Sequence, residues 1–373
     1  MRIAILGHFP IADAPPTGGV QSVIANLRDE LARREEVELH LIQNRRGVPV
    51  GRFSREGWTE HNLPARDHRF IPNMWRTGAL LRPLLETLQP DVVSTHQPEY
   101  AVVTLQMGLP TLHTIHGFPA HEFWNRRGLF TRAATLWEVW LERRTLNLAR
   151  HLVAISDMVI QRYRHRTRAV FHRINNPVSP LFFAPAPPPT PGRVLLVGNL
   201  TPRKGMEIAI QAVARLRERF PHLHLLIVGR EADPGYAEAM RALARPLGDA
   251  VQFLAPTNQQ GIRALLWTSQ ILLLTSREEH APMIIGEAMA VGRPVVATRV
   301  GAVSGMVEEG RTGYLAGPED VAGVAASLAR LLDDPAHAEA MGREAARLAQ
   351  ARYHPRAVAD AYLRAMHETM AMA

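Results

Sequence analysis

The chain has 373 residues, of which 46% are hydrophobic and 21% charged, and none is a cysteine. This size predicts about two domains, the apolar content excludes an intrinsically disordered chain, and the lack of cysteine excludes disulfide scaffolds, cysteine-ligated metal sites and thiol enzymes. The net charge is +8, of which residues 1–180 carry +7. This asymmetry favours an anionic partner for the first half, with solvated surface arginines as the alternative.

The first half alternates short apolar strands with helical patterns. Residues 3–6 form a predicted strand, a loop follows that ends at Gly18 and Gly19, and residues 20–31 have helical periodicity. Further strands are predicted at residues 37–42, 92–95, 111–115, 152–155 and 169–174. Residues 10–17 and 47–64 show no pattern and are expected to be loops.

A proline-rich stretch at residues 184–191 is predicted to be a stiff linker between two domains, at residues 1–183 and 192–354. The strand and helix alternation then starts again. Strands are predicted at residues 193–197, 223–228, 251–254, 271–274 and 294–298, with a helix at 206–220. The tail, residues 355–373, is expected to form a helix that packs back on the first domain.

Short, nearly continuous apolar strands separated by helices indicate parallel sheets covered on both faces. The expected fold class is therefore α/β, with two doubly wound, Rossmann-like domains that bind ligands beyond the carboxyl ends of their strands. The sequence has no run of eighteen apolar residues and no signal-like leader. A cytoplasmic protein, soluble or at the inner face of the membrane, is expected.

Two glutamates follow the predicted strand at residues 271–274. Glu279 lies just past its carboxyl end, and Glu287 comes eight residues later in the next helix, for whose first turn Pro282 is suited. The N-terminus of that helix is a natural seat for a phosphate, and carboxylates beside it would accept hydrogen bonds from sugar hydroxyls. The alternative is that Glu279 is a helix-start charge and Glu287 a surface residue.

Residues 276–298 resemble the E-x(7)-E region of glycosyltransferase family 4, the retaining enzymes of GT-B architecture. Other matches follow in family order along nearly the whole chain: Gly18 and Gly19, residues 114–117, residues 153–156, Asn176, residues 197–205, Gly301 and residues 313–315. The resemblance implies a GT-B fold with two facing domains. It also implies transfer of a hexose from a UDP- or GDP-linked sugar to a lipid-linked, polysaccharide or small-molecule acceptor, with no further cofactor.

The resemblance also implies roles for individual residues. Glu287 would hold the ribose hydroxyls, Glu279 the donor sugar, and the amides of Met283 and Ile284 the diphosphate. Arg203 and Lys204 would stabilise the leaving diphosphate and His116 would lie under the donor sugar, with Gly18, Gly19 and Asn199 completing the donor site. Asn199 stands where many relatives have an arginine, which removes one expected phosphate cation. Lys204 is the single lysine among 43 basic residues.

The sequence also bears on metal, membrane and nucleic-acid partners. No metal is expected, because the chain lacks an Asp-x-Asp triplet and because His113 and His116, three apart on a strand, point to opposite faces. The basic helical pattern at residues 130–148, with Arg126 and Arg127 before it, suits either an anionic membrane or packing on the sheet, and the fold favours packing. Nucleic acid is not expected, since aromatic platforms are lacking.

Three other functions remain open at this point. A sugar phosphorylase or a nucleotide-sugar epimerase would share the architecture. A catalytically silent module that binds a nucleotide sugar is the third, and Asn199 is the feature that favours it.

Overall fold

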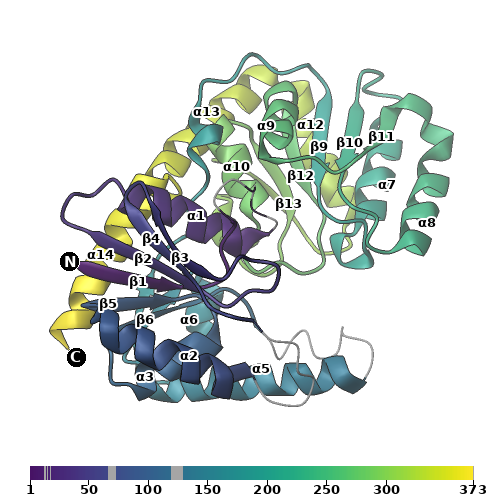
Figure 1. Ribbon diagram of the computed structural model, residues 1–373. Coiled ribbons are helices and arrows are strands. Elements are labelled where there is room, and N and C mark those ends of the chain that lie inside the picture. The colour runs from purple at the N-terminus through teal and green to yellow at the C-terminus, as the bar shows by residue number, and fades with distance from the viewer. Residues whose placement is uncertain (12–13, 15, 17, 66–72, 119–128, 373) are drawn as a thin grey trace. The chain divides into compact units, whose positions relative to one another are not determined.

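The computed structural model describes residues 1–11, 14, 16, 18–65, 73–118 and 129–372. The chain divides into two compact units, each coloured along the sequence in Figure 1. Unit 1 comprises residues 1–177 together with 355–373, and unit 2 comprises residues 178–354. Arg126 and Arg127 lie outside the described residues.

Unit 1 contains an eight-stranded sheet in the order β3-β4-β2-β1-β5-β6-β7-β8. Its strands are β1 (Arg2–Leu6), β2 (Glu38–Gln43), β3 (Gly51–Arg55), β4 (Trp58–Asn62), β5 (Val92–Thr95), β6 (Thr111–Ile115), β7 (His151–Ala154) and β8 (Val170–Arg173). Its helices are α1 (Gly19–Leu31), α2 (Asn73–Leu88), α3 (Pro98–Gln106), α5 (Leu129–Leu148), α6 (Asp157–Tyr163) and α14 (Pro355–Ala371). All neighbouring strands are parallel except β3 and β4, so most strands end at the same edge.

The hairpin of β3 and β4 contradicts the loop expected at residues 47–64. Neither strand has an apolar run, because β3 is an exposed edge strand and β4 buries the polar side chains Glu60, His61 and Asn62. Asn62 accepts a hydrogen bond from the Gln43 amide at 3.1 Å. When the buried face of a strand is polar and hydrogen-bonded, its sequence lacks the alternation of apolar and polar residues that predicts a strand.

Helices cover both faces of the unit 1 sheet. On one face Ile3 and Leu41 pack with Leu27 of α1 and with Tyr362 of α14. On the other, β1 and β2 pack with α2 and α3 through apolar residues that include Tyr100. The Tyr362 hydroxyl lies 3.0 Å from Thr114 Oγ1 on β6, so the last helix belongs to the core of the first unit.

Unit 2 contains a six-stranded, fully parallel sheet in the order β11-β10-β9-β12-β13-β14. The strands are β9 (Arg193–Val197), β10 (His224–Val228), β11 (Val251–Leu254), β12 (Ile271–Leu274), β13 (Val295–Thr298) and β14 (Gly313–Ala316). The α-helices are α7 (Met206–Leu216), α8 (Pro234–Ala244), α9 (Gln259–Thr268), α10 (Met283–Val291), α11 (Val303–Met306), α12 (Val321–Asp333) and α13 (Pro335–Arg352), and the 3-10 turns are η1 (Pro180–Phe183), η2 (Pro202–Lys204) and η3 (Arg245–Ala250).

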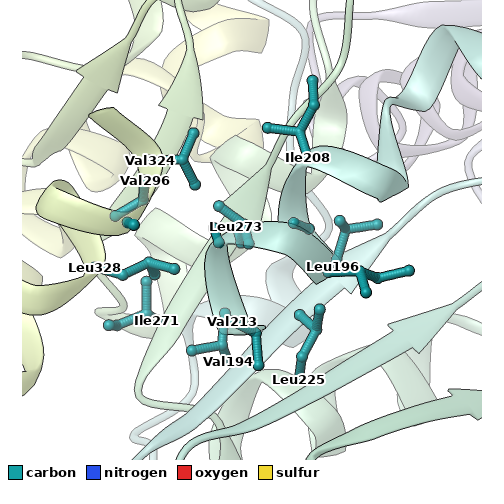
Figure 2. Packing of buried hydrophobic residues seen from close by; sticks show 14 of the residues in the cluster. Val194, Leu196, Ile208, Val213, Leu225, Ile271, Leu273, Val296, Val324 and Leu328 are labelled. Atoms are coloured by element: carbon teal, nitrogen blue, oxygen red, sulfur yellow. The ribbon is translucent and has the colours of Figure 1, made fainter. Parts of the chain in front are cut away.

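The two faces of this sheet have separate apolar cores. Figure 2 shows the first, in which Val194, Leu196 and Leu273 from the strands meet Val213 of α7 and Leu328 of α12. The alternate residues on the same strands, such as Leu195 and Leu272, point to the other face of the sheet and pack into the second core with α10 and α13. Burial on both faces explains why these strands read as continuous apolar runs.

The proline-rich stretch is not the boundary between the units, which lies at Pro177 and Val178. Phe182 of η1 is fully buried in the second core, and the Arg293 guanidinium donates to the Pro187 carbonyl oxygen at 2.8 Å. Residues 184–191 therefore pack against unit 2 and do not act as a spacer.

The helix predicted at 206–220 ends at Leu216. Among the described residues no helix combines the length and apolarity that crossing a bilayer requires.

Candidate functional site

Lys204 and Glu279 form an ion pair at the carboxyl end of the unit 2 sheet. Lys204 Nζ donates to Glu279 Oε1, and the Ser276 hydroxyl donates to the same oxygen at 2.7 Å. Glu279 is only 6% exposed, so both of these contacts lie in the protein interior, where an unpaired carboxylate would be costly. A cation and a carboxylate 75 residues apart in the sequence are thus held together as one polar centre, here called the Lys204–Glu279 pair.

Arg203 lies at the rim of this pair. Its guanidinium is 4.0 Å from Glu279 Oε2 and donates to the Glu278 carbonyl oxygen at 3.2 Å, while 48% of its side chain remains exposed. Asn199 lies exposed just beyond β9. Asn199 carries no charge, but Arg203 supplies a cation close to the Lys204–Glu279 pair.

Glycines let the polypeptide turns approach this centre closely. A Cβ atom on Gly198 would lie 3.1 Å from the side chain of Lys204, which crosses it. Gly205 has a φ of 57°, and a Cβ there would lie 2.4 Å from the Thr275 carbonyl oxygen. Gly301 has a φ of 51°, and its Cβ would lie 1.7 Å from the carbonyl oxygen of Glu279. The backbone of Glu279 is thus fixed by a position that accepts only glycine.

Substitution of Gly301 by alanine is expected to destabilise unit 2 by roughly 2–4 kcal/mol. The new Cβ would clash with the Glu279 carbonyl oxygen, and alanine would also be strained in the left-handed backbone conformation. Gly310 is the matched control, since its φ is 72° and nothing lies within 4 Å of its Cβ position. Gly310→Ala should cost only about 1 kcal/mol. Urea unfolding of the two variants measures the difference, and equal losses would contradict the close packing on Glu279.

Arg277 is a residue that the sequence reading missed. Its guanidinium bonds Glu319 at 2.5 Å, Glu207 at 2.6 Å and the Pro202 carbonyl oxygen, and its N–H donates to the Arg203 carbonyl oxygen at 2.8 Å. It thereby fastens η2 to β12 and to α7. Its partners are distant in sequence, so no local pattern could have shown this role.

Helix α10 begins beside Glu279, with Pro282 at its N-cap and not in its first turn. The N–H groups of Met283 and Ile284 have no acceptor within the helix, as at any helix start. Glu287 lies one turn further along, and burial raises the pKa of its carboxyl to about 7. This helix start therefore combines N–H groups that have no acceptor within the helix with a carboxyl whose pKa lies near neutral pH.

In unit 1, Gly18 and Gly19 lie at the start of α1. Gly18 is the N-cap, in extended conformation, with open space around its Cβ position. The pair therefore leaves the N–H groups at this helix start accessible. Neither residue has a side chain that could cover them.

His116 follows β6 and forms a cluster with His96 and His113. His116 Nε2 lies 2.9 Å from His96 Nδ1, with the rings stacked at 5.2 Å, and His113 Nδ1 lies 2.9 Å from Thr95 Oγ1. Burial lowers the pKa of His116 to about 4 and of His113 to about 3. The cluster is therefore neutral at pH 7 and lines a cavity of about 180 Å³.

In the described part of the chain, no group of three or more metal-ligating side chains is placed to hold a metal ion.

Two family models match the chain. The model for glycosyltransferase family 4 matches residues 17–180, and the model for glycosyl transferases group 1 matches residues 179–348. A glycogen synthase of Mycobacterium tuberculosis is 30% identical over 283 residues, which cover 73% of this chain and 68% of that protein.

Solved structures share the fold along the whole chain. Sucrose-phosphate synthase of Thermosynechococcus elongatus superposes with a TM-score of 0.82 at 21% identity, covering 100% of both chains. Anabaena HepE, solved in complex with UDP-glucose, superposes with a TM-score of 0.72 at 18% identity, again over 100% of both chains. The fold of this chain, with one Rossmann-like α/β sheet in each unit, is therefore the GT-B architecture.

Proposed function

Because this chain belongs to glycosyltransferase family 4, we propose that it transfers a hexose from a nucleoside diphosphate sugar to an acceptor hydroxyl with retention of anomeric configuration. The single observation that carries this proposal is the Lys204–Glu279 pair, placed beside the start of α10 and its carboxyl Glu287. This arrangement supplies fixed positive charge, backbone donors and hydroxyl acceptors within one unit.

In the proposed reaction the bond from the anomeric carbon to the diphosphate breaks, and the acceptor oxygen forms its bond on the same face. The acceptor proton passes to the leaving phosphate oxygen. Lys204 and Arg203 stabilise the charge that the diphosphate gains, which lowers the barrier because the cations are already in place. Donors at the start of α10 bind the same group.

Glu279 serves as a hydroxyl acceptor and not as a covalent nucleophile. One of its oxygens already accepts bonds from Lys204 and Ser276, which lowers its reactivity toward carbon. Its second oxygen remains for hydroxyls of the donor sugar. Glu287 accepts the ribose hydroxyls, and the neutral imidazole of His116 contacts the sugar. Two-carboxylate glycosidase chemistry, with a pair flanking one bond, is not part of the proposal.

The donor is proposed to be UDP-linked, with GDP as the alternative, since HepE was solved with UDP-glucose. The proposed acceptor is a glycan, a lipid-linked compound or a small molecule, and the proposed location is cytoplasmic, at the inner face of the membrane for a lipid-linked acceptor. No metal is part of the proposal, because Lys204 and Arg203 are proposed to neutralise the diphosphate.

Incubation of the protein with a panel of UDP- and GDP-sugars, followed by detection of released nucleoside diphosphate, tests the proposal. Release from one donor, with a retained product anomer by NMR, is expected. Tight binding of one donor without release under any acceptor would instead favour the catalytically silent module, for which Asn199 is the specific observation. Formation of a sugar 1-phosphate from a glycan and inorganic phosphate would favour a phosphorylase, and conversion of one nucleotide sugar into its epimer would favour an epimerase.

His96 is expected to be a positioning residue for His116. Within the described residues, His96 Nε2 is buried without a hydrogen-bond partner, so a proton there would be an unsatisfied donor. We therefore assign the proton to His96 Nδ1, as donor to His116 Nε2, which leaves the His116 proton on Nδ1. His96→Phe should lower kcat roughly 10- to 100-fold with the donor KM nearly unchanged.

The control is a second histidine pair in the same unit. His151 Nδ1 lies 2.9 Å from His172 Nε2, with the rings stacked at 5.2 Å. His172→Phe removes a bond of the same geometry and should leave kcat unchanged. Initial-rate kinetics measure both variants, and an effect on the donor KM alone in His96→Phe would contradict the positioning role.

A further inference from the structure

The turn that carries the proposed leaving-group cations is held in place from outside. Turn η2 comprises only 3 residues, which are too few to form a helix that is stable by itself. The Pro202 carbonyl oxygen accepts a bond from the Arg277 guanidinium, and the Arg203 oxygen accepts one from the Arg277 N–H at 2.8 Å. The Lys204 oxygen accepts a bond from the Thr275 hydroxyl at 3.3 Å. The position of η2 therefore depends on the segment that follows β12, and above all on Arg277.

Two carboxylates fix the guanidinium of Arg277. Its Nε and Nη2 donate to the two oxygens of Glu319, at 2.5 and 2.9 Å, which is the bidentate geometry that a planar guanidinium favours. Nη2 also donates to Glu207 Oε1 at 2.6 Å, and Glu207 Oε2 accepts a bond from the Tyr236 hydroxyl. The Tyr236 oxygen in turn accepts the N–H of Met206 at 2.9 Å. One side chain thus joins η2, the start of α7 and the turn before α12.

Glu319 has a strained backbone. Its φ is 61°, in the left-handed region that residues with a side chain rarely adopt. Among the described residues that are not glycine, Gln89 in unit 1 is the other one with a positive φ. A glycine at position 319 would remove the strain, but it would also remove the carboxylate that binds Arg277 through both oxygens. The turn before α12 is therefore strained at the residue that orients the guanidinium.

The bonds of Arg277 act on the backbone of η2 and not on the reacting groups. In the part of the chain that the structure describes, none of them goes to the Lys204 ammonium or to the Glu279 carboxylate. The Lys204 side chain passes close to Gly198 on its way to Glu279, so its reach is set by where η2 lies. A displacement of about 1 Å at such a position can cost a factor of roughly 100 in rate.

We infer that Arg277 is a positioning residue for Lys204, and that Glu319 and Glu207 hold its guanidinium in the orientation that this role requires. These three residues, here called the Arg277 network, keep the Lys204 ammonium in place before the diphosphate gains charge. The inference deepens the proposed function and rests on it for the expected effect on turnover. The expected effect on the Lys204 amine is independent of that function.

The single lysine of the chain allows a test that requires no activity. Acetylation with N-hydroxysuccinimide acetate modifies one side-chain amine, and peptide mass spectrometry separates it from the α-amine of the chain. In the wild type the Lys204 side chain is only 12% exposed and paired, so it should react slowly. Arg277→Met and Glu319→Gly should each speed its acetylation roughly tenfold, because η2 opens more often.

The control is an ion pair between the other ends of the same two helices. Arg219, just beyond α7, donates to both oxygens of Asp333, the last residue of α12, at 2.9 and 2.7 Å. Arg219→Met removes this pair and should leave the acetylation rate of Lys204 unchanged. Melting temperatures are measured on the same samples. Glu319→Gly should melt close to the wild type, because relief of the strained backbone offsets the lost pair.

Initial-rate kinetics with the donor that the wild type uses test the effect on turnover. Arg277→Met should lower kcat roughly 10- to 100-fold and leave the donor KM within about threefold. Arg277→Lys should lower kcat as well, because an ammonium keeps the charge but lacks the planar fork. This variant is used for kinetics alone, since it adds a second lysine. Glu319→Gly should lower kcat roughly tenfold, and Arg219→Met should not change it.

Three results would overturn the inference. The first is wild-type turnover in Arg277→Lys, because a positive charge alone would then suffice. The second is an equal change of acetylation and kcat in Arg277→Met and Arg219→Met. The third is wild-type acetylation and kcat in Glu319→Gly.

Failure of the proposed function would look different. If the wild type releases nucleoside diphosphate from no donor, yet Lys204 acetylation responds to Arg277→Met and not to Arg219→Met, the Arg277 network keeps its role and the proposed transfer is lost. If transfer is normal and neither acetylation nor kcat responds to Arg277→Met, the proposed function stands and this inference is lost.

Discussion

Replacement of Glu287 by glutamine is expected to weaken binding of the nucleoside diphosphate sugar at least about a hundredfold. An ionised carboxylate accepts two ribose hydroxyls, and each such charge-assisted bond contributes about 1.5–3 kcal/mol. Glutamine offers one weaker acceptor and turns an N–H₂ toward the other hydroxyl. Calorimetric titration with the donor measures the loss. Glu339→Gln, at an exposed position on α13, is the control and should bind normally.

The same carboxyl predicts a pH dependence. Its pKa of about 7 means that the ionised acceptor becomes dominant only above neutral pH, so donor affinity should rise between pH 6 and pH 8. The glutamine variant should show a flat profile over this range. A wild-type affinity that falls with rising pH would contradict the assignment of Glu287 to the ribose.

Stability should change in the opposite direction to binding. The folded pKa lies above the value of 4.5 for a free glutamate, so the folded state holds the proton more tightly and loses stability as pH rises from about 4.5 to about 7. Glu287→Gln removes that penalty and should be more stable than the wild type at pH 8, by about 1–3 kcal/mol, and nearly equal to it at pH 4.5. Urea unfolding at the two pH values measures the difference.

Replacement of Lys204 by methionine is expected to lower turnover about 100- to 1,000-fold, with a smaller loss of donor affinity. The cation acts mainly on charge that develops as the diphosphate departs, so its removal raises the barrier more than it weakens the bound state. Single-turnover release of the nucleoside diphosphate measures the rate. Turnover within about threefold of the wild type would exclude Lys204 as the leaving-group cation.

A structural loss must be separated from this catalytic one. Lys204→Met leaves Glu279 buried beside Ser276 without its cation, which costs about 3–5 kcal/mol of stability for a pair of this kind. The double variant Lys204→Met with Glu279→Gln removes the unpaired charge and should recover most of the stability. Its turnover should stay low, because the cation is still missing. Recovery of both together would assign Lys204 a purely structural role.

The sequence was most informative where burial was complete. Strands β9 and β12 are buried on both faces, and the apolar runs that predicted them have the same bounds as the observed strands. The hairpin of β3 and β4 was invisible because its contacts are polar. The site was likewise predictable only in part. Glu279 and Lys204 could be found as motif residues. Their ion pair joins two loops 75 residues apart, and no local periodicity encodes such a contact.

Residues that act through other residues were the hardest to predict. Arg277 and His96 have ordinary sequence neighbours, and their importance comes from the guanidinium, carboxylate and ring nitrogens that the fold gathers around them.

The final helix has a consequence for the order in which the chain can mature during synthesis. Unit 2 is continuous from Val178 to His354 and has all of its core once His354 has emerged from the ribosome. Unit 1 begins first but must wait for α14, because Tyr362 and Met366 fill its core beside β1 and β6. Until then the apolar surface that α14 covers stays exposed to solvent, and a chain in that state is prone to aggregate.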